Sequence, residues 1–546
     1  MIFDAGNKKV SDQEEIYKRL AQIIEEGSAG FFFGAGMSQN AGIPVVPTIV
    51  NSIVSSLTLP EIYAKRIIEL KYPFEAFLEI LNRYSPLDKF LEIFKLGEPT
   101  AFHQLVKFLI GKGLVSQLLT TNFDLLIEKT DIPSLNVVYD EKEFRFLSSE
   151  KVNYIKVHGG INKASTIRTV MNTIAKKQMR ERRKQAIDFF FKQAKLKTVF
   201  VFGYSCSDKL DLTPYIKAAA GTNTKIVFVN HSQGDVIIDD IIGANNPFSR
   251  YKGLLVNCNT DDLICYLADY FRAPVTYSQS HVELNGALDY SELTFYKKAL
   301  FGAGLLFRNG CYKEAAGLLQ NAIKFDGDSI YRVEMISFLF EIYHNIQTGS
   351  SRAMADILPE GVTFKMMKDE KDRALMRLEK ESNGKLREER IAGLKTHWGH
   401  FLLSCKKYDE AMQSYDEALD VFFKTSNTYR VYQSHNNIAN TIFTRWKNGE
   451  SELTGEEVYQ ECYTRWHKCL LYFRQSAYPF EYEISCENLA ELLLYFRRNQ
   501  TRRIENYLNT AKELSEYLND LTGVANCAEL MRKCLQPKSV LSVKSV

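Results

Sequence analysis

Gly30-Phe31-Phe32-Phe33-Gly34-Ala35-Gly36-Met37-Ser38 is the stretch of sequence that decides the fold of the N-terminal half. Consecutive phenylalanines are typical of a strand that is buried on both faces of a parallel sheet, and the glycines that follow predict a tight turn. Such a turn lets main-chain N–H groups approach a phosphate closely. Gly-x-Gly after a strand is weak evidence by itself, because a tight turn that binds nothing has the same pattern.

Further apolar, β-branched or aromatic runs follow this strand. They are residues 115–119, 154–157, 198–202, 225–229 and, more weakly, 254–256. Helical stretches separate these runs, which is the alternation of a parallel sheet covered by helices on both faces. A capping box from Ser11 to Glu14 predicts a helix that ends near Glu26, before the first strand. We therefore predict an α/β fold with a doubly wound, Rossmann-like parallel sheet.

The predicted N-terminal domain spans residues 1–275, and it has a helical insertion at 44–110 because no strand-like run interrupts that stretch. A polar linker is expected at 276–290. Residues 291–546 are predicted to form an all-α domain, which includes one long exposed helix over 368–390. One spacing of apolar residues occurs three times in it: Ala315, Leu319, Ala322; Ala411, Tyr415, Ala418; and Ile504, Leu508, Ala511. This pattern resembles tetratricopeptide repeats, but its copies do not keep the usual period of about 34 residues, so another α-solenoid stays open.

Composition excludes several classes of protein. A net charge of +3, from 69 basic and 66 acidic residues, gives no reason to expect nucleic-acid or membrane binding. Ten cysteines are scattered without a Cys-x-x-Cys pair, which is typical of free thiols in a reducing cytosol and predicts no structural zinc. No apolar signal core or membrane span is visible, so we expect a cytoplasmic protein. The basic helix at 175–197 is interpreted as a solvated face, with a phosphate or partner patch as the alternative.

Polar residues, glycines and one alanine follow the first five predicted strands. They are Gly34, Ala35, Gly36 and Ser38; Asn122 and Asp124; His158; Gly203, Ser205 and Asp208; and Asn230. Because ligands bind beyond the carboxyl ends of the strands in open parallel sheets, we expect these residues to converge on a nucleotide site. Taken singly, His158 would more commonly be a turn residue and Asn122 a helix N-cap.

In this order the motifs resemble the sirtuin family of NAD-binding proteins, and specifically its prokaryotic, defence-associated NADase branch, over residues 10–275. The resemblance implies that Ala35, Gly36 and Ser38 line the diphosphate and ribose of NAD+. It places Ser205 near the phosphates and Asn230 at the adenosine ribose, with Gly34, Gly203 and Asp208 beside them. Asn122 and His158 become the expected catalytic pair, and Asp124 either orients Asn122 or hydrogen-bonds a ribose.

The chemistry of NAD+ cleavage fits this pair. Breaking the nicotinamide N-glycosidic bond passes through an oxocarbenium-like transition state, and the leaving group departs neutral. The site must then supply a positioned water or ribose hydroxyl and a base near neutral pH, which suits the amide of Asn122 and the imidazole of His158. Protein-deacylating sirtuins have a four-cysteine zinc module and Asp-Phe-Arg after Gly-Ile-Pro. Here Val45-Val46-Pro47 follows, which favours hydrolysis of free NAD+ without zinc.

The sequence thus predicts a cytoplasmic NAD+ glycohydrolase. The resemblance to the defence-associated sirtuin branch implies a role as an anti-phage effector in abortive infection. We expect a homo-oligomer that is activated through the helical repeats by a protein partner or a phage-derived activator. Two alternatives stay open. One is an NAD-dependent protein deacylase, and the other is a catalytically silent sensor of NAD or ADP-ribose in which the repeats are the output.

Overall fold

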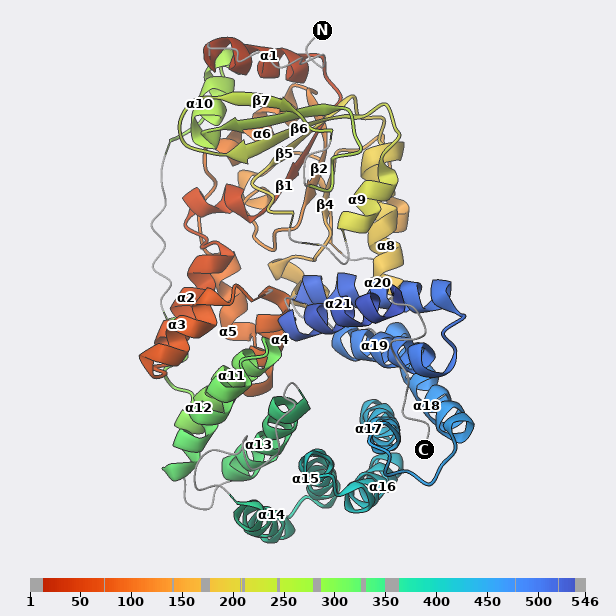
Figure 1. Cartoon of the computed structure of the whole chain (residues 1–546). Helices are drawn as coiled ribbons and strands as arrows, with labels where there is room; N and C mark the ends of the chain where they lie inside the picture. Colours follow the sequence, from red (N-terminus) through yellow and green to blue (C-terminus); the bar gives the residue numbers. More distant parts are fainter. Residues whose placement is uncertain are drawn as a thin grey trace. The chain divides into compact units, whose positions relative to one another are not determined.

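The computed structural model describes residues 13–72, 74–139, 142–167, 177–206, 208, 212–242, 246–277, 286–325, 330–348, 363–476, 478–518 and 520–535. The chain divides into two compact units (Figure 1). The first consists of Met1–Ile53 and Pro86–Asp289, and the second of Val54–Ser85 and Tyr290–Val546.

In its described part, the first unit is built on one eight-stranded sheet. The strands are β1 Ala29–Phe33, β2 Val115–Thr120, β3 Asn136–Val138, β4 Asn153–Lys156, β5 Thr198–Phe202, β6 Lys225–His231, β7 Ile237–Asp240 and β8 Gly253–Cys258. Their order is β3-β4-β2-β1-β5-β6-β8-β7, and only the β7–β8 pair is antiparallel. The predicted parallel sheet is confirmed. The sequence missed β3, which is very short, and β7, which has no buried face.

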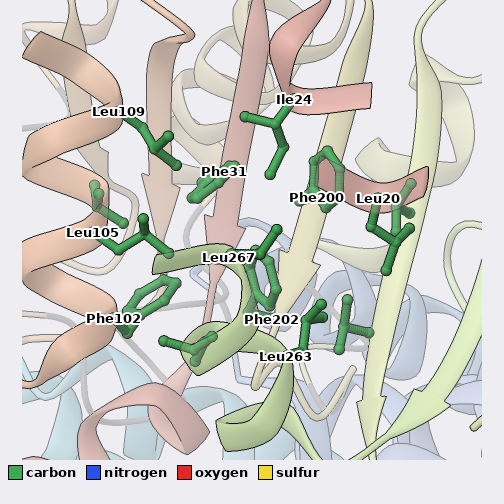
Figure 2. Packing of buried hydrophobic residues seen from close by; sticks show 14 of the residues in the cluster. Leu20, Ile24, Phe31, Phe102, Leu105, Leu109, Phe200, Phe202, Leu263 and Leu267 are labelled. Atoms are coloured by element: carbon green, nitrogen blue, oxygen red, sulfur yellow. The ribbon is translucent and has the colours of Figure 1, made fainter. Parts of the chain in front are cut away.

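Alternate side chains of the central strands enter two separate cores. On one face Phe31, Phe200 and Phe202 meet α1 (Gln13–Glu25), α6 (Ala101–Gly111) and α10 (Thr260–Phe271), as Figure 2 shows. On the other face Phe32 and its neighbours pack against α8 (Lys177–Asp188) and α9 (Thr213–Ala219). Burial on both faces explains why these strands are apolar at every position.

The connections that follow β1 and β5 run to opposite faces of the sheet. After β1 the chain returns to β2 through α6, whereas after β5 it continues to β6 through α9. Because β1 and β5 are adjacent, their carboxyl ends mark the topological switch point of the sheet. Ligands bind at such a point in open α/β sheets, because the diverging connections leave a crevice there.

The second unit is helical throughout its described part. Its helices are α3 Glu61–Glu69, α4 Phe74–Tyr84, α11 Phe295–Arg308, α12 Tyr312–Lys324, α13 Ile330–Thr348, α14 Phe364–Glu379, α15 Gly384–Ser404, α16 Tyr408–Lys424, α17 Thr428–Lys447, α18 Gly455–Ser476, α19 Pro479–Phe496, α20 Thr501–Leu518 and α21 Leu521–Leu535, while α2 (Val46–Ser56) spans the boundary between the units. The three sets of spaced apolar residues lie in α12, α16 and α20, and all are buried. Gly399 lets α15 approach α16 closely, since a Cβ there would lie 2.6 Å from the Tyr415 ring. The predicted α-solenoid is confirmed.

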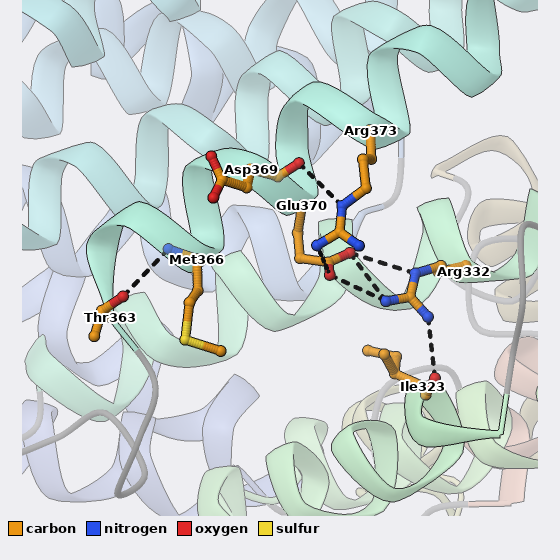
Figure 3. A network of polar contacts seen from close by, with 7 residues as sticks. All are labelled: Ile323, Arg332, Thr363, Met366, Asp369, Glu370 and Arg373. Carbon is orange, nitrogen blue, oxygen red and sulfur yellow. Dashed lines mark hydrogen bonds and ion pairs between the residues drawn. The ribbon is translucent and has the colours of Figure 1, made fainter.

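Two predicted helices differ from the structure. The expected helix over 368–390 is broken into α14 and α15, because Asn383 begins a new helix by accepting a hydrogen bond from the Leu386 N–H at 3.1 Å. Figure 3 shows that Arg332 of α13 holds α14 through Glu370, with N···O distances of 3.0 and 3.1 Å.

The expected basic helix over 175–197 is also shorter than predicted. It consists of α8 and a π-helical turn, Phe189–Gln193, and residues 175–176 lie outside the described ones. Its interpretation as a solvated face is wrong at Arg183, whose side chain is fully buried. A charge reversal there would therefore disturb the core of the first unit.

Candidate active site

The carboxyl ends of the central strands lie level with one another. Phe33 pairs with Thr120 on one side and with Phe202 on the other, and Thr120 pairs in turn with Lys156. The residues that follow these positions therefore emerge at one edge of the sheet. That edge includes the switch point between β1 and β5.

The loops after β1 and β5 are packed backbone against backbone. The N–H of Gly34 donates to the Phe202 carbonyl and that of Gly36 to the Gly203 carbonyl, both at 3.0 Å. A Cβ on Gly34 would lie 2.7 Å from the Gly203 oxygen, and one on Gly203, whose φ is +56°, would lie 2.7 Å from the Met37 nitrogen. These glycines thus serve close packing, and the N–H groups of Gly34 and Gly36 are already used. Ala35 and Gly36 remain exposed at the start of the 3-10 helix Ala35–Ala41.

Asn122 is held in one orientation. Its Nδ2 donates to the Gly34 carbonyl at 3.1 Å and to the Ser38 hydroxyl at 3.0 Å. Because a carbonyl can only accept, the nitrogen end of the amide must face Gly34, which fixes the assignment of the two amide atoms. Both Nδ2 hydrogens are then in use. Oδ1 is the atom of Asn122 that can accept a hydrogen bond from a water or a hydroxyl group.

Ser38 and Asp124 extend this network inward. The Ser38 hydroxyl donates to Asp124 Oδ2 at 2.7 Å, and Asp124 Oδ1 accepts from the Leu126 N–H at 3.2 Å. Both side chains are buried, at 2% and 3% exposure. Of the two expected roles of Asp124, this arrangement matches the orientation of Asn122, which it reaches through Ser38.

His158 lies in the loop after β4, and it meets a residue from the loop after β5. Its Nε2 is 3.8 Å from Asp208 Oδ1, and its side chain is only 6% exposed. Since β2 and β1 lie between β4 and β5, these two loops converge above the strand ends that bear Asn122 and Gly34. A nearby carboxylate stabilises the imidazolium, so Asp208 favours the form that His158 takes after accepting a proton.

The two remaining predicted contacts are more peripheral. Ser205 is exposed two residues after Gly203. Asn230 is exposed at the end of β6, where its Nδ2 donates to Asn257 Oδ1 at 2.8 Å. Because β6 is two strands away from β1, Asn230 stands apart from the Asn122 network along the same edge.

Sequence reasoning missed two polar residues that build this site. The Thr120 hydroxyl donates to the Phe33 carbonyl at 2.8 Å and accepts from the Asn122 N–H at 3.0 Å, so it ties the ends of β1 and β2 together. Lys156 is fully buried in β4, and its ammonium donates to the Asp124 main-chain carbonyl. A single lysine within the apolar run at 154–157 was the signal that could have identified it.

The cysteines and the charged clusters offer no metal ligands in the described residues. No group of three His, Cys, Asp or Glu side chains there is placed to hold a metal ion. All ten cysteines are free thiols. Within the same residues, no helix combines the length and the apolar character that crossing a membrane requires.

Residues 116–235 match the SIR2-like domain family. The matched segment runs from β2 to just after β6, so it includes Asn122, His158 and Asn230, whereas the loop at Gly34 precedes it. The first unit therefore contains a SIR2-like domain. This confirms the resemblance to the sirtuin family and supports an NAD-related function.

Other comparisons contribute less. A search of curated proteins found no significant match to this chain. Among solved structures, the chain is similar to the crystal structure of BtubC (BKLC) from P. vanneervenii, with 13% sequence identity and a TM-score of 0.24. The similarity covers 42% of this chain and 90% of that one. A TM-score this low supports no argument about fold or function.

Proposed function

We propose that this protein is an NAD+ glycohydrolase that cleaves NAD+ to nicotinamide and ADP-ribose. The observation that supports the proposal most is the geometry of Asn122. Its amide is fixed at the switch point of a SIR2-like domain with Oδ1 as the available acceptor, beneath the loop that carries His158.

The proposed roles follow from the chemistry of the bond that breaks. Nicotinamide leaves as a neutral molecule, so the site needs little acid catalysis and must instead activate the group that replaces it. Oδ1 of Asn122 accepts a hydrogen bond from the attacking water or from a ribose hydroxyl, and His158 takes up the proton. Asp208 stabilises the resulting imidazolium across the 3.8 Å gap.

The biological role that we propose is the one implied by the sirtuin-like resemblance. The protein would act in the cytoplasm as an anti-phage effector that depletes NAD+ in abortive infection. An NADase must be restrained in a healthy cell, and the α-solenoid offers an extended surface for a partner or a phage-derived activator. We propose that the active form is a homo-oligomer.

A direct assay tests the proposed activity. The purified full-length chain is incubated with NAD+, with and without extract from phage-infected cells, and nicotinamide and ADP-ribose are separated by chromatography. Equal release of both products supports the proposal. O-acyl-ADP-ribose formed from an acylated peptide would identify a deacylase instead. Binding of ADP-ribose without any turnover would identify a silent sensor.

A further inference from the structure

Lys156 is a charged residue in the buried interior of the sheet, where an ammonium group is normally unfavourable. Its side chain is fully buried in β4, two residues before His158. An ammonium group buried in this way is unfavourable unless it is paired and hydrogen-bonded. Lys156 meets both conditions, because Nζ lies 2.9 Å from Glu128 Oε1 and donates to the main-chain carbonyl of Asp124. Its stem passes Gly160, where a Cβ would lie 3.3 Å from the Lys156 Cε.

The contact with Asp124 continues into the catalytic network. Asp124 accepts from the Ser38 hydroxyl at 2.7 Å, and Ser38 accepts from Asn122 at 3.0 Å. Asn122 in turn donates to the Gly34 carbonyl at 3.1 Å. A buried chain of polar contacts therefore runs from β4, past the end of β2, to the loop after β1.

A second contact holds the same segment without any side chain. The N–H of Ile161 donates to the carbonyl of Phe123 at 3.0 Å. The loop after β2 is thus tied to the loop after β4 even when Lys156 is replaced. Lys156 adds a further constraint on Asp124, and so on the orientation of the side chains beyond it.

We propose that Lys156 is a positioning residue that fixes the orientation of Asn122 through Asp124 and Ser38. The inference rests on the proposed NAD+ cleavage. It also assigns Ser38 a role in holding Asn122, in place of the direct contact with NAD+ that the sirtuin resemblance implies. Lys156 itself touches no reacting atom in this assignment.

The competing explanation is that Lys156 only neutralises Glu128. Two variants separate the explanations. Lys156→Met leaves the partly buried Glu128 carboxylate without its partner, so it should lower the melting temperature whichever explanation holds. Lys156→Met combined with Glu128→Gln removes both charges and should recover most of that loss. If Lys156 positions Asn122, kcat of the double variant stays about 100-fold below wild type, the loss expected from a shift of about 1 Å in a catalytic group.

The same steady-state assay gives the remaining readouts, with fluorescent etheno-NAD+ as the substrate of the full-length chain. KM should change less than about 3-fold, since binding contacts are retained and only transition-state interactions are lost. Lys129→Met is the matched control, because Lys129 also donates to a main-chain carbonyl, that of Gly97, but outside the network. It should keep wild-type kcat.

Each outcome is decisive. Recovery of kcat together with the melting temperature in the double variant would overturn the positioning role and leave the proposed NADase standing. Loss of activity in Lys129→Met would show that the effect on kcat is not specific to Lys156. That result would also overturn the positioning role. A wild-type chain that releases no nicotinamide under any condition would instead overturn the proposed function, and this inference with it.

Discussion

Asn122 combines two roles that a motif cannot separate. Its amide nitrogen joins Gly34 to Ser38, which stabilises the loop after β1, and its amide oxygen is the acceptor that the proposed reaction needs. His158 is different, because its contact with Asp208 at 3.8 Å is electrostatic and longer than a hydrogen bond. A substitution of Asn122 should therefore affect stability as well as activity.

Asn122→Ala and His158→Ala should each abolish NAD+ cleavage. Asn122→Ala should also destabilise the fold by about 1 to 3 kcal/mol, since it leaves a buried carbonyl without its donor. Thermal melting and nicotinamide release measure the two effects. Asn309→Ala is a matched control for stability, because buried Asn309 donates to the Leu305 carbonyl at 3.0 Å in the helical unit. Full activity of either site variant would contradict the assignment.

The residues that sequence identified and those that it missed differ in one physical respect. Asn122, His158 and Gly34 follow apolar runs, so their place at strand ends is visible in the pattern. Lys156 and Thr120 lie within strands, and what makes them important is complete burial next to a particular carbonyl. Burial and pairing depend on tertiary contacts, which one sequence without its structure does not display.

Two loops from distant parts of the sequence behave as a single structural element at the switch point. The turn at Gly34 and the turn at Gly203 share hydrogen bonds at 3.0 Å and leave no room for a Cβ between them. The sirtuin resemblance implies that both glycines lie beside the bound NAD+. In the structure the first requirement on both is close approach of two backbones.

Gly203→Ala should disrupt this element and abolish NAD+ cleavage. Two costs add, namely the positive φ of +56° and the contact of 2.7 Å with the Met37 nitrogen. Gly221→Ala isolates the first cost, because Gly221 has a φ of +98° but no atom within 4 Å of an added Cβ. The control should lose about 1 kcal/mol of stability and stay active. Equal melting temperatures for the two variants would show that the backbone contact is unimportant.

The packing of α19 against α20 and α21 contains a buried carboxyl group. Glu483 is 1% exposed; its Oε1 accepts from the Ser515 hydroxyl, and its Oε2 is buried without a partner among the described residues. Burial, followed by the nearby Asp520 carboxylate, raises the pKa of Glu483 to about 9. The folded state therefore holds this proton at neutral pH, while the unfolded chain releases it near its ordinary value of 4.5.

Stability of the helical unit should consequently fall as pH rises from about 4.5 to 9, because the folded state binds more protons than the unfolded state across that range. Glu483→Gln should remove this slope and stabilise the protein at pH 7 by up to roughly 3 kcal/mol. Urea unfolding between pH 5 and 9 measures it. Glu513→Gln, an exposed substitution on α20, should keep the wild-type slope. A slope unchanged by Glu483→Gln would mean that the carboxyl is ionised when folded.

At the scale of the whole molecule, the sequence predicts the strands and helices better than it predicts which helices pack together. The order of strand-like runs predicted the parallel sheet, and the spaced alanines predicted the solenoid. The sequence assigned residues 44–110 to the N-terminal domain as a helical insertion, because no strand-like run interrupts that stretch. In the structure residues 54–85 instead pack with the solenoid, where the Phe77 and Phe301 rings lie 5.4 Å apart. A helical pattern reveals that a face is buried, but not which helices cover it.

This division predicts that the chain cannot be cut simply after Asp289. The buried residues of α3 and α4, which include Ile67, Phe77 and Leu81, pack on α11, and each contributes about 1.5 to 3 kcal/mol by leaving water. Residues 1–289 expressed alone would expose them as one apolar patch, so we expect aggregation in light scattering.

Co-expression of residues 1–289 with residues 290–546 should rescue the fragment, since α11 then covers the same face and the two pieces copurify. The double variant Ile67→Lys/Phe77→Lys gives the complementary test, because it makes the buried face of α3 and α4 charged. Residues 1–289 with these substitutions should be soluble when expressed alone, and they should no longer copurify with residues 290–546. Exposed Ile62→Lys on α3 is the matched control and should do neither. If unmodified residues 1–289 are soluble and monomeric, α3 and α4 do not need the solenoid, and regulation through it would have to act by another route.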